Sequence, residues 1–138
     1  MIPKEKLQDL HIDMEALANL VAMTGTSYFR GTFRSKSFDG VPWAPAKIDL
    51  TGKRRRGSLM VDSAALMNSV RAAEVTPQRI VWSAGNDKVP YAEVHNTGGR
   101  AGRGRGFTMP KRQFIGDSAE LQAKIEQRIN TYLRTVLK

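Results

Sequence analysis

The stretch DSAELQAKIEQRINTYLRTV, residues 117–136, carries apolar side chains at spacings of mostly three and four residues. Such spacings place these side chains on one face of a helix. Asp117 precedes Glu120 by three residues, which is the spacing of a capping-box variant. We therefore expect an amphipathic helix that begins after Asp117 and packs against a core through Leu121, Ile125, Ile129, Tyr132, Leu133 and Val136.

A second helical pattern begins after Asp13, whose carboxylate is suited to be the N-cap. The pattern is formed by Met14, Leu17, Leu20, Val21, Tyr28 and Phe29. Gly25 and Gly31 weaken it towards its end, while Phe33 is compatible with an extension, so its last turns stay open.

The region between the two helices predicts short elements and irregular loops. Proline and glycine mark residues 37–57 as an irregular connection. A short helix is expected to begin at Asp62, and the alanines that would allow it to pack closely extend as far as Ala73. Residues 73–76 and 79–83 predict two β-strands around Pro77 and Gln78, and residues 91–95 predict a third.

These elements predict an α+β fold. We expect two long amphipathic helices and a short one packed on one face of an antiparallel sheet, because each helix needs an apolar surface to cover. With 138 residues and no internal repeat, the chain has the size of a single domain, residues 1–138, with long irregular basic loops.

The composition favours an anionic neighbour. Twenty-two Lys and Arg oppose thirteen Asp and Glu, for a formal net charge of +9. Two segments concentrate this charge: the run from Lys53 through Arg54 and Arg55 to Arg56, and residues 98–106, GGRAGRGRG, which predict a mobile loop. The chain has no cysteine, which excludes disulfides and thiolate metal sites. No apolar run has the length of a membrane span, so no membrane contact is expected.

Four segments occur in order: SFDGVPWAPAK, LMVDSAALMNSV, VPYAEVHNTGG and MPKRQFIGDS. Together they resemble the phage virion morphogenesis, or tail-completion, family, over a match from about Phe33 to the C-terminus. The resemblance rests on Gly40, Pro42 and Trp43; Leu59, Asp62 and Leu66; Tyr91, Ala92, His95 and Gly98; and Pro110, Arg112, Phe114 and Gly116.

The resemblance implies a structural protein that completes the neck or tail end late in assembly. It further implies a ring, most simply a hexamer, around the DNA channel, in contact with connector and tail proteins. Such a protein is made in the cytoplasm of the bacterial host and ends in the virion. The arginine- and glycine-rich insert between His95 and Pro110 departs from the family pattern, which leaves its role open.

Trp43 and His95 each allow a structural and a functional interpretation. Trp43 either pins its loop to the core, which we favour, or belongs to an arm that bridges subunits of a ring. His95 is interpreted as a structural residue at a strand end, since no nucleophile accompanies it. We expect no catalytic residue, no metal, because the Cys and His clusters of zinc sites and the loops of calcium sites are missing, and no cofactor.

The leading alternative is a nucleic-acid-binding module of low sequence specificity. Arg100, Arg103, Arg105, Lys111 and Arg112 follow one another with no acidic residue between Glu93 and Asp117. Arginine and glycine segments bind phosphate backbones through charge and stacking, although three arginines provide few contacts. An acidic protein surface would explain the same charge. With Trp43 and residues 53–56, these cations are the expected exposed or interfacial residues.

Overall fold

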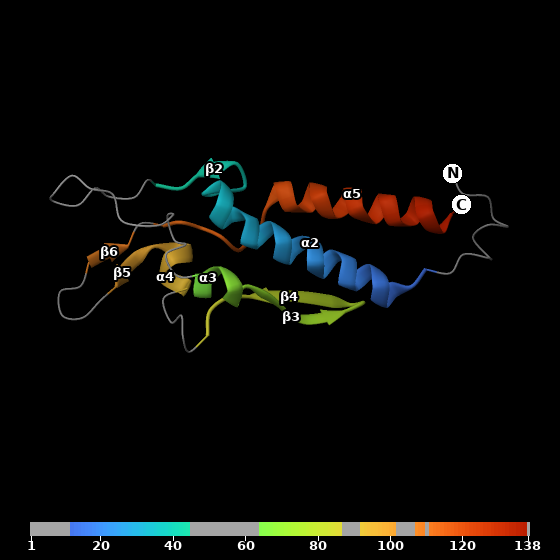
Figure 1. Ribbon diagram of the computed structural model, residues 1–138, viewed down its shortest axis with the longest axis horizontal. Helices are drawn as coiled ribbons and strands as arrows, with labels where there is room; N and C mark the ends of the chain where they lie inside the picture. The colour runs from blue at the N-terminus through green and yellow to red at the C-terminus, as the bar shows by residue number, and fades with distance from the viewer. Residues whose placement is uncertain (1–11, 45–63, 87–91, 102–106, 110, 138) are drawn as a thin grey trace.

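The computed structural model of the chain describes residues 12–44, 64–86, 92–101, 107–109 and 111–137 (Figure 1). The α+β fold class is confirmed. The elements in chain order are α2 (Met14–Ser35), β1 (Ser37–Phe38), β2 (Val41–Pro42), α3 (Ala64–Ser69), β3 (Arg71–Thr76), β4 (Arg79–Ser83), α4 (Ala92–Thr97), β5 (Gly99–Ala101), β6 (Phe107–Met109) and α5 (Ala119–Val136).

Helix α2 begins as predicted and runs further than its glycines suggest. The Asp13 carboxylate accepts a hydrogen bond from the Ala16 amide at 3.0 Å, which confirms the N-cap. The helix ends at Ser35, and its C-cap Lys36 has a left-handed φ of 56° and an amide that donates to the Thr32 carbonyl at 2.7 Å. Burial of Phe29 and Phe33 outweighs the low helix propensity of the glycines.

Gly25 of α2 is where the helix meets the β3–β4 hairpin. A Cβ atom at Gly25 would lie 2.2 Å from Cζ2 of Trp82 in β4. The Trp82 indole instead lies against the bare backbone and donates to the Ala22 carbonyl at 3.1 Å. A residue that weakens the helix in isolation is therefore required by its packing.

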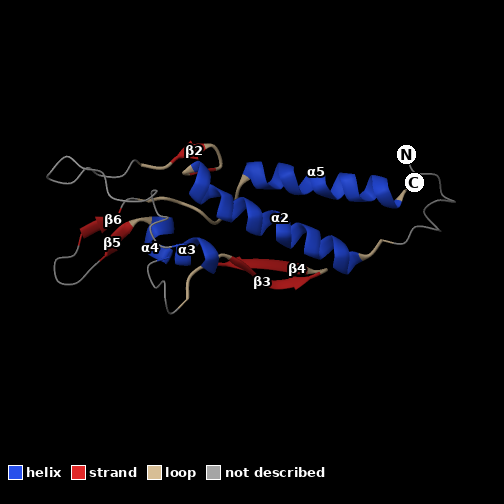
Figure 2. Ribbon diagram, viewed as in Figure 1, coloured by secondary structure: helices blue, strands red, loops and turns tan. Residues whose placement is uncertain are grey.

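Helix α2 lies between α5 on one side and the β3–β4 hairpin on the other (Figure 1). The expectation that both long helices cover one face of a single sheet is therefore wrong. Within the described residues, the six strands form three separate antiparallel pairs, β1–β2, β3–β4 and β5–β6 (Figure 2). Each pair is two strands wide, and α2 packs against the Trp82 side chain of the β3–β4 pair.

The β3–β4 hairpin turns at Pro77 and Gln78, as predicted, with Thr76 opposite Arg79. Strand β3 begins at Arg71, so the expected extension of the short helix to Ala73 is wrong. The Arg30 guanidinium of α2 donates to the Val70 carbonyl at 2.8 and 3.1 Å, directly after α3 ends. This contact and the pairing of Ala72 with Trp82 explain why the chain leaves the helix there.

The third predicted strand, residues 91–95, is also wrong, because α4 spans Ala92–Thr97. One of its hydrogen bonds lies within the helix, where the Thr97 hydroxyl donates to the Glu93 carbonyl at 2.9 Å. Other contacts reach distant parts of the chain, because the Asn96 side chain of α4 accepts hydrogen bonds from the backbone amides of residues 114 and 115. A short segment takes the conformation that such tertiary contacts stabilise.

Helix α5 is confirmed, but its cap is one residue later than predicted. Ser118 is the N-cap, and its hydroxyl accepts from the Leu121 amide at 3.1 Å. The Asp39 carboxylate accepts from the Glu120 amide at 3.0 Å, so a residue from the β1–β2 turn replaces Asp117 in the capping arrangement. In the described part of the chain, no helix combines the length and apolar character needed to span a bilayer.

Candidate assembly site

The residues of the fourth motif run between α4 and Trp43 as an extended segment, residues 111–115. The Arg112 amide donates to the His95 carbonyl at 2.8 Å, and the Trp43 indole donates to the Gln113 carbonyl at 2.7 Å. The Asn96 carboxamide oxygen accepts from the amides of Phe114 and Ile115 at 2.9 and 3.1 Å. We call Trp43, Asn96 and residues 111–115 the hairpin base, since β5 and β6 extend from it.

The hairpin base is part of the aromatic core. Phe33 and Phe114 are fully buried, with ring centroids 5.1 Å apart. The Trp43 ring meets Phe33 edge to face at 5.6 Å, and Trp43 is 9% exposed. This burial agrees with the interpretation of Trp43 as a pin for its loop and contradicts its placement among exposed residues.

Arg112 is the second predicted surface residue that the structure buries, at 7% exposure. Its Nε donates to the Ala44 carbonyl at 3.1 Å, which ties residues 111–115 to the segment after Trp43. Burial lowers the pKa of the guanidinium, which nevertheless stays charged. Arg112 therefore belongs to the hairpin base, whereas its neighbour Lys111 is exposed as expected.

His95 lies on α4, half-buried beside Arg112, and does not end a strand. Burial lowers its pKa, and the positive charge of Arg112 lowers it further. Both effects favour the neutral imidazole over the charged one. Its Nδ1 is buried and has no hydrogen-bond partner among the described residues.

The β5–β6 hairpin places Gly99 opposite Met109, Arg100 opposite Thr108 and Ala101 opposite Phe107. The prediction of a loop is therefore wrong for residues 99–101. Gly98, at φ +75°, precedes the hairpin, and a Cβ there would lie 3.0 Å from the Lys111 amide nitrogen. The absence of a side chain at Gly98 thus allows its backbone to lie directly against Lys111 of the hairpin base. Arg103, Arg105, Pro110, Tyr91 and the run Lys53–Arg56 lie outside the described residues.

Besides Gly98, two further glycines of the motifs occupy left-handed backbone. Gly40 has φ +81° in the β1–β2 turn, and Gly116 has φ +142° before α5. The pair Asp39–Gly40 is a strong signal for a two-residue hairpin turn, with Phe38 opposite Val41. That signal could have predicted the first hairpin, which our sequence analysis treated as an irregular connection.

Sequence reasoning also missed a polar network that joins α2, the β1–β2 turn and α5. The Tyr28 hydroxyl donates to the Glu120 carboxylate at 2.9 Å and accepts from the Asp39 amide at 3.1 Å. The Ser118 hydroxyl lies 3.0 Å from the Tyr28 hydroxyl and 2.9 Å from Asp39 Oδ1. Hydrogen bonds from the Glu120 amide and from Ser118 lower the pKa of Asp39, and burial raises that of Tyr28. The network positions the long helices beside the hairpin base.

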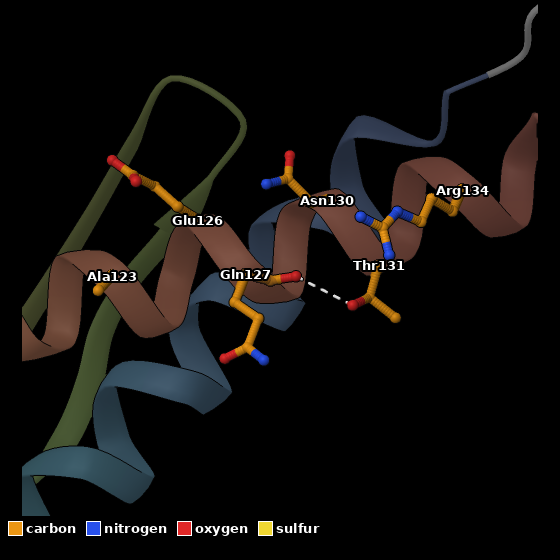
Figure 3. Close-up of a pocket in the computed structure, with 6 residues that line it drawn as sticks. All are labelled: Ala123, Glu126, Gln127, Asn130, Thr131 and Arg134. Carbon is orange, nitrogen blue, oxygen red and sulfur yellow. Dashed lines mark hydrogen bonds between the residues drawn. The ribbon is translucent and has the colours of Figure 1, made fainter.

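Two shallow hollows lie away from the hairpin base. One is a groove of about 670 Å³ between α2 and β3. The other, about 380 Å³, lies along α5, where the Thr131 hydroxyl donates to the Gln127 carbonyl at 3.0 Å (Figure 3). It is lined by Ala123, Glu126, Gln127, Asn130, Thr131 and Arg134. The groove between α2 and β3 has a mainly apolar lining and the hollow along α5 a mainly polar one, and open hollows of this kind suit contact with another macromolecule.

The described residues define an α+β domain in which an arginine-bearing hairpin extends from a buried, hydrogen-bonded base. The chain belongs to the phage virion morphogenesis family, whose model matches residues 4–134. It is similar to the Mu-like prophage FluMu G protein 2 of Haemophilus influenzae, with 35% identity over 86 residues. That alignment covers 62% of this chain and 59% of the relative, so the chain spans less than two thirds of the relative's length. No solved structure matches it.

Proposed function

We propose that the protein is a structural component of the head-to-tail junction of a tailed phage. In this role it completes the neck or the tail end and forms a ring, most simply a hexamer, around the DNA channel. It acts by contacts with copies of itself and with connector and tail proteins, and it makes or breaks no bonds. It is made in the cytoplasm of the bacterial host and is carried in the virion.

The observation that carries this proposal is the use of the motif residues within the family match. Trp43, Arg112 and Phe114 are buried and hold the chain segments from which the β5–β6 hairpin extends. Buried, hydrogen-bonded side chains of this kind keep a surface element in place for a partner. The family membership supports a role in virion assembly.

The test is a deletion in the phage genome complemented by the protein in trans. We expect unjoined heads and tails in electron micrographs of the deletion, and joined, infectious particles after complementation. Normal yields of joined particles without the protein would refute the proposal. A Phe114→Ala variant provides an intermediate case, since it destabilises the hairpin base without changing the surface charge.

Non-specific contact of the hairpin with DNA is a second candidate function. Arg100 lies on β5, and the exposed Lys111 lies at the foot of the hairpin. Replacement of Arg100, Arg103 and Arg105 by alanine should weaken binding of duplex DNA. The slope of log affinity against log salt should fall by roughly 2–3, the value for three lost phosphate contacts.

The control carries alanine at Arg71, Arg79 and Arg128, three exposed residues outside the β5–β6 hairpin. It therefore has the same net charge as the variant without Arg100, Arg103 and Arg105. Titration of duplex DNA and single-stranded RNA at several salt concentrations compares the two variants. Equal losses in both would assign the binding to net charge, and affinity that ignores salt would refute an electrostatic contact.

A further inference from the structure

The groove between α2 and β3 carries an exposed apolar side chain and is bordered by basic residues. Met23 is 71% exposed, and the small residues Ala22 and Ala72 lie beside it. Arg30 and Arg34 line the groove towards the C-terminal end of α2. A flexible thioether above small side chains is suited to pack against another helix.

The outer face of α5 is shaped for such a contact. Ala123, Gln127, Asn130 and Arg134 recur at spacings of four, three and four residues, which makes a continuous row along the helix. Ala123 lies two residues beyond the buried Leu121, about 200° further round the helix. The row therefore points away from α2, which passes behind α5 in Figure 3.

The groove and the α5 face lie on opposite sides of the helix pair. Tyr28 of α2 bonds to Glu120 of α5, and Met23 is five residues from Tyr28, about 140° round the helix. Two unlike surfaces on opposite sides of a subunit form a head-to-tail contact, which is repeated from one subunit to the next. A rotation at each step then closes a ring.

Charge along the two surfaces selects one orientation. In α2, Glu15 comes first and Arg30 and Arg34 come last, whereas Asp117 lies just before α5 and Arg134 lies near its end. The two helices of one subunit run antiparallel (Figure 1). Suppose that a neighbour's α5 lies in the groove antiparallel to α2, with its Ala123 opposite Met23. Arg134 is then level with position 12 of α2, three residues from Glu15, and Asp117 is level with position 29, beside Arg30. Opposite charges then face each other at both ends.

We propose that the occupant of the α2–β3 groove is α5 of a second copy of this chain, and that Met23 packs against Ala123 of that copy. This interface rests on the proposed ring and assigns its subunit contact. Each α2 would then lie between its own α5 and that of its neighbour.

Cysteine cross-linking tests the contact directly, because the chain has no cysteine of its own. Met23→Cys and Ala123→Cys are both changes at exposed positions, so neither should disturb the fold. In phage-producing cells that carry the deletion, a chain with both changes should form a ladder of disulfide-linked oligomers under oxidation. A mixture of the two single variants should stop at dimers.

The matched control combines Ala123→Cys with Gln78→Cys, at the exposed turn of the β3–β4 hairpin. The Met23 pair should exceed this control in cross-linked product by more than about tenfold. A Met23→Glu variant should reduce incorporation into particles by a similar factor, since it places a charge in a packed contact.

The outcomes separate the interface from the proposed function. Protein that joins heads to tails in complemented cells without a cross-linked ladder overturns the interface alone. Disulfide dimers from Ala123→Cys by itself also overturn it, because they show a symmetric pairing of α5 helices. Joined particles in cells that lack the protein overturn the function, and with it the ring that the interface would build.

Discussion

The two ends of the α2–α5 helix pair are held together in different ways. Near the hairpin base, the network of Tyr28, Asp39 and Ser118 joins the helices beside fully buried aromatic rings. At the other end, the Asp13 amide donates to the Tyr132 hydroxyl at 3.3 Å, and the apolar side chains of α5 are only half-buried. Stability is therefore concentrated where the arginine-bearing hairpin is attached.

The largest effect should come from the aromatic core. Phe114→Ala removes a fully buried ring and should lower the free energy of unfolding by about 3–5 kcal/mol. Chemical denaturation of the purified protein measures the loss. A loss below about 1 kcal/mol would show that the hairpin base does not dominate stability.

The second test uses the contrast between two glycines of α2. Gly25→Ala places a methyl group inside the Trp82 ring and should cost about 1–3 kcal/mol. Gly31→Ala is the matched control, because nothing lies within 4 Å of its Cβ position, and it should stabilise the helix by about 0.5–1 kcal/mol. Equal effects in thermal unfolding would contradict the assigned role of Gly25.

The polar network should give a smaller and pH-dependent effect. Ser118→Ala removes the N-cap of α5 and should cost about 1 kcal/mol, whereas Ser27→Ala on the exposed face of α2 should change little. The folded pKa of Asp39 lies below its usual 3.8, so the carboxylate stabilises the fold above that pH, and the contribution is lost as pH falls through the folded pKa.

Asp39→Asn should therefore lower the melting temperature at pH 7. The difference in melting temperature between the variant and the wild type should become smaller in acid. Melting curves between neutral and acidic pH provide the comparison. A gap that stays constant with pH would show that the charge of Asp39 makes no contribution.

The smallest effect is expected at the far end. Val136→Ala, in the last turn of α5, loses partly buried methyl groups but gains helix propensity, so the free energy of unfolding should change by less than about 0.5 kcal/mol. A large loss in the same denaturation assay would mean that the two ends are equally important.

The long helices and the β3–β4 hairpin could be predicted because their signals are local. Asp13 caps α2, and a repeat of apolar residues defines each helix. The conformation of residues 92–97 could not, since the bonds from Asn96 to residues 114 and 115 join segments far apart in the sequence. The same limit applies to Ser118, whose role as N-cap depends on Asp39, which lies 79 residues away.

The candidate site was predicted in part. The aromatic and glycine positions of the motifs indicated where the chain is constrained, but their residue types do not distinguish a surface from a core. Arg112 was expected at the surface because arginine is rarely buried. Its burial depends on the Ala44 carbonyl, a backbone acceptor that no side-chain pattern reveals.

The closed foot of the β5–β6 hairpin separates its anchoring from its reach. Gly98 meets Lys111 directly, and Asn96 on one side of the hairpin binds the Phe114 amide on the other, so these residues close the foot of the hairpin. A change of length or charge in the sequence between Ala101 and Phe107 should therefore leave this closure intact. A short peptide tag inserted there should leave the protein folded and give microscopists a marker for the hairpin in intact virions.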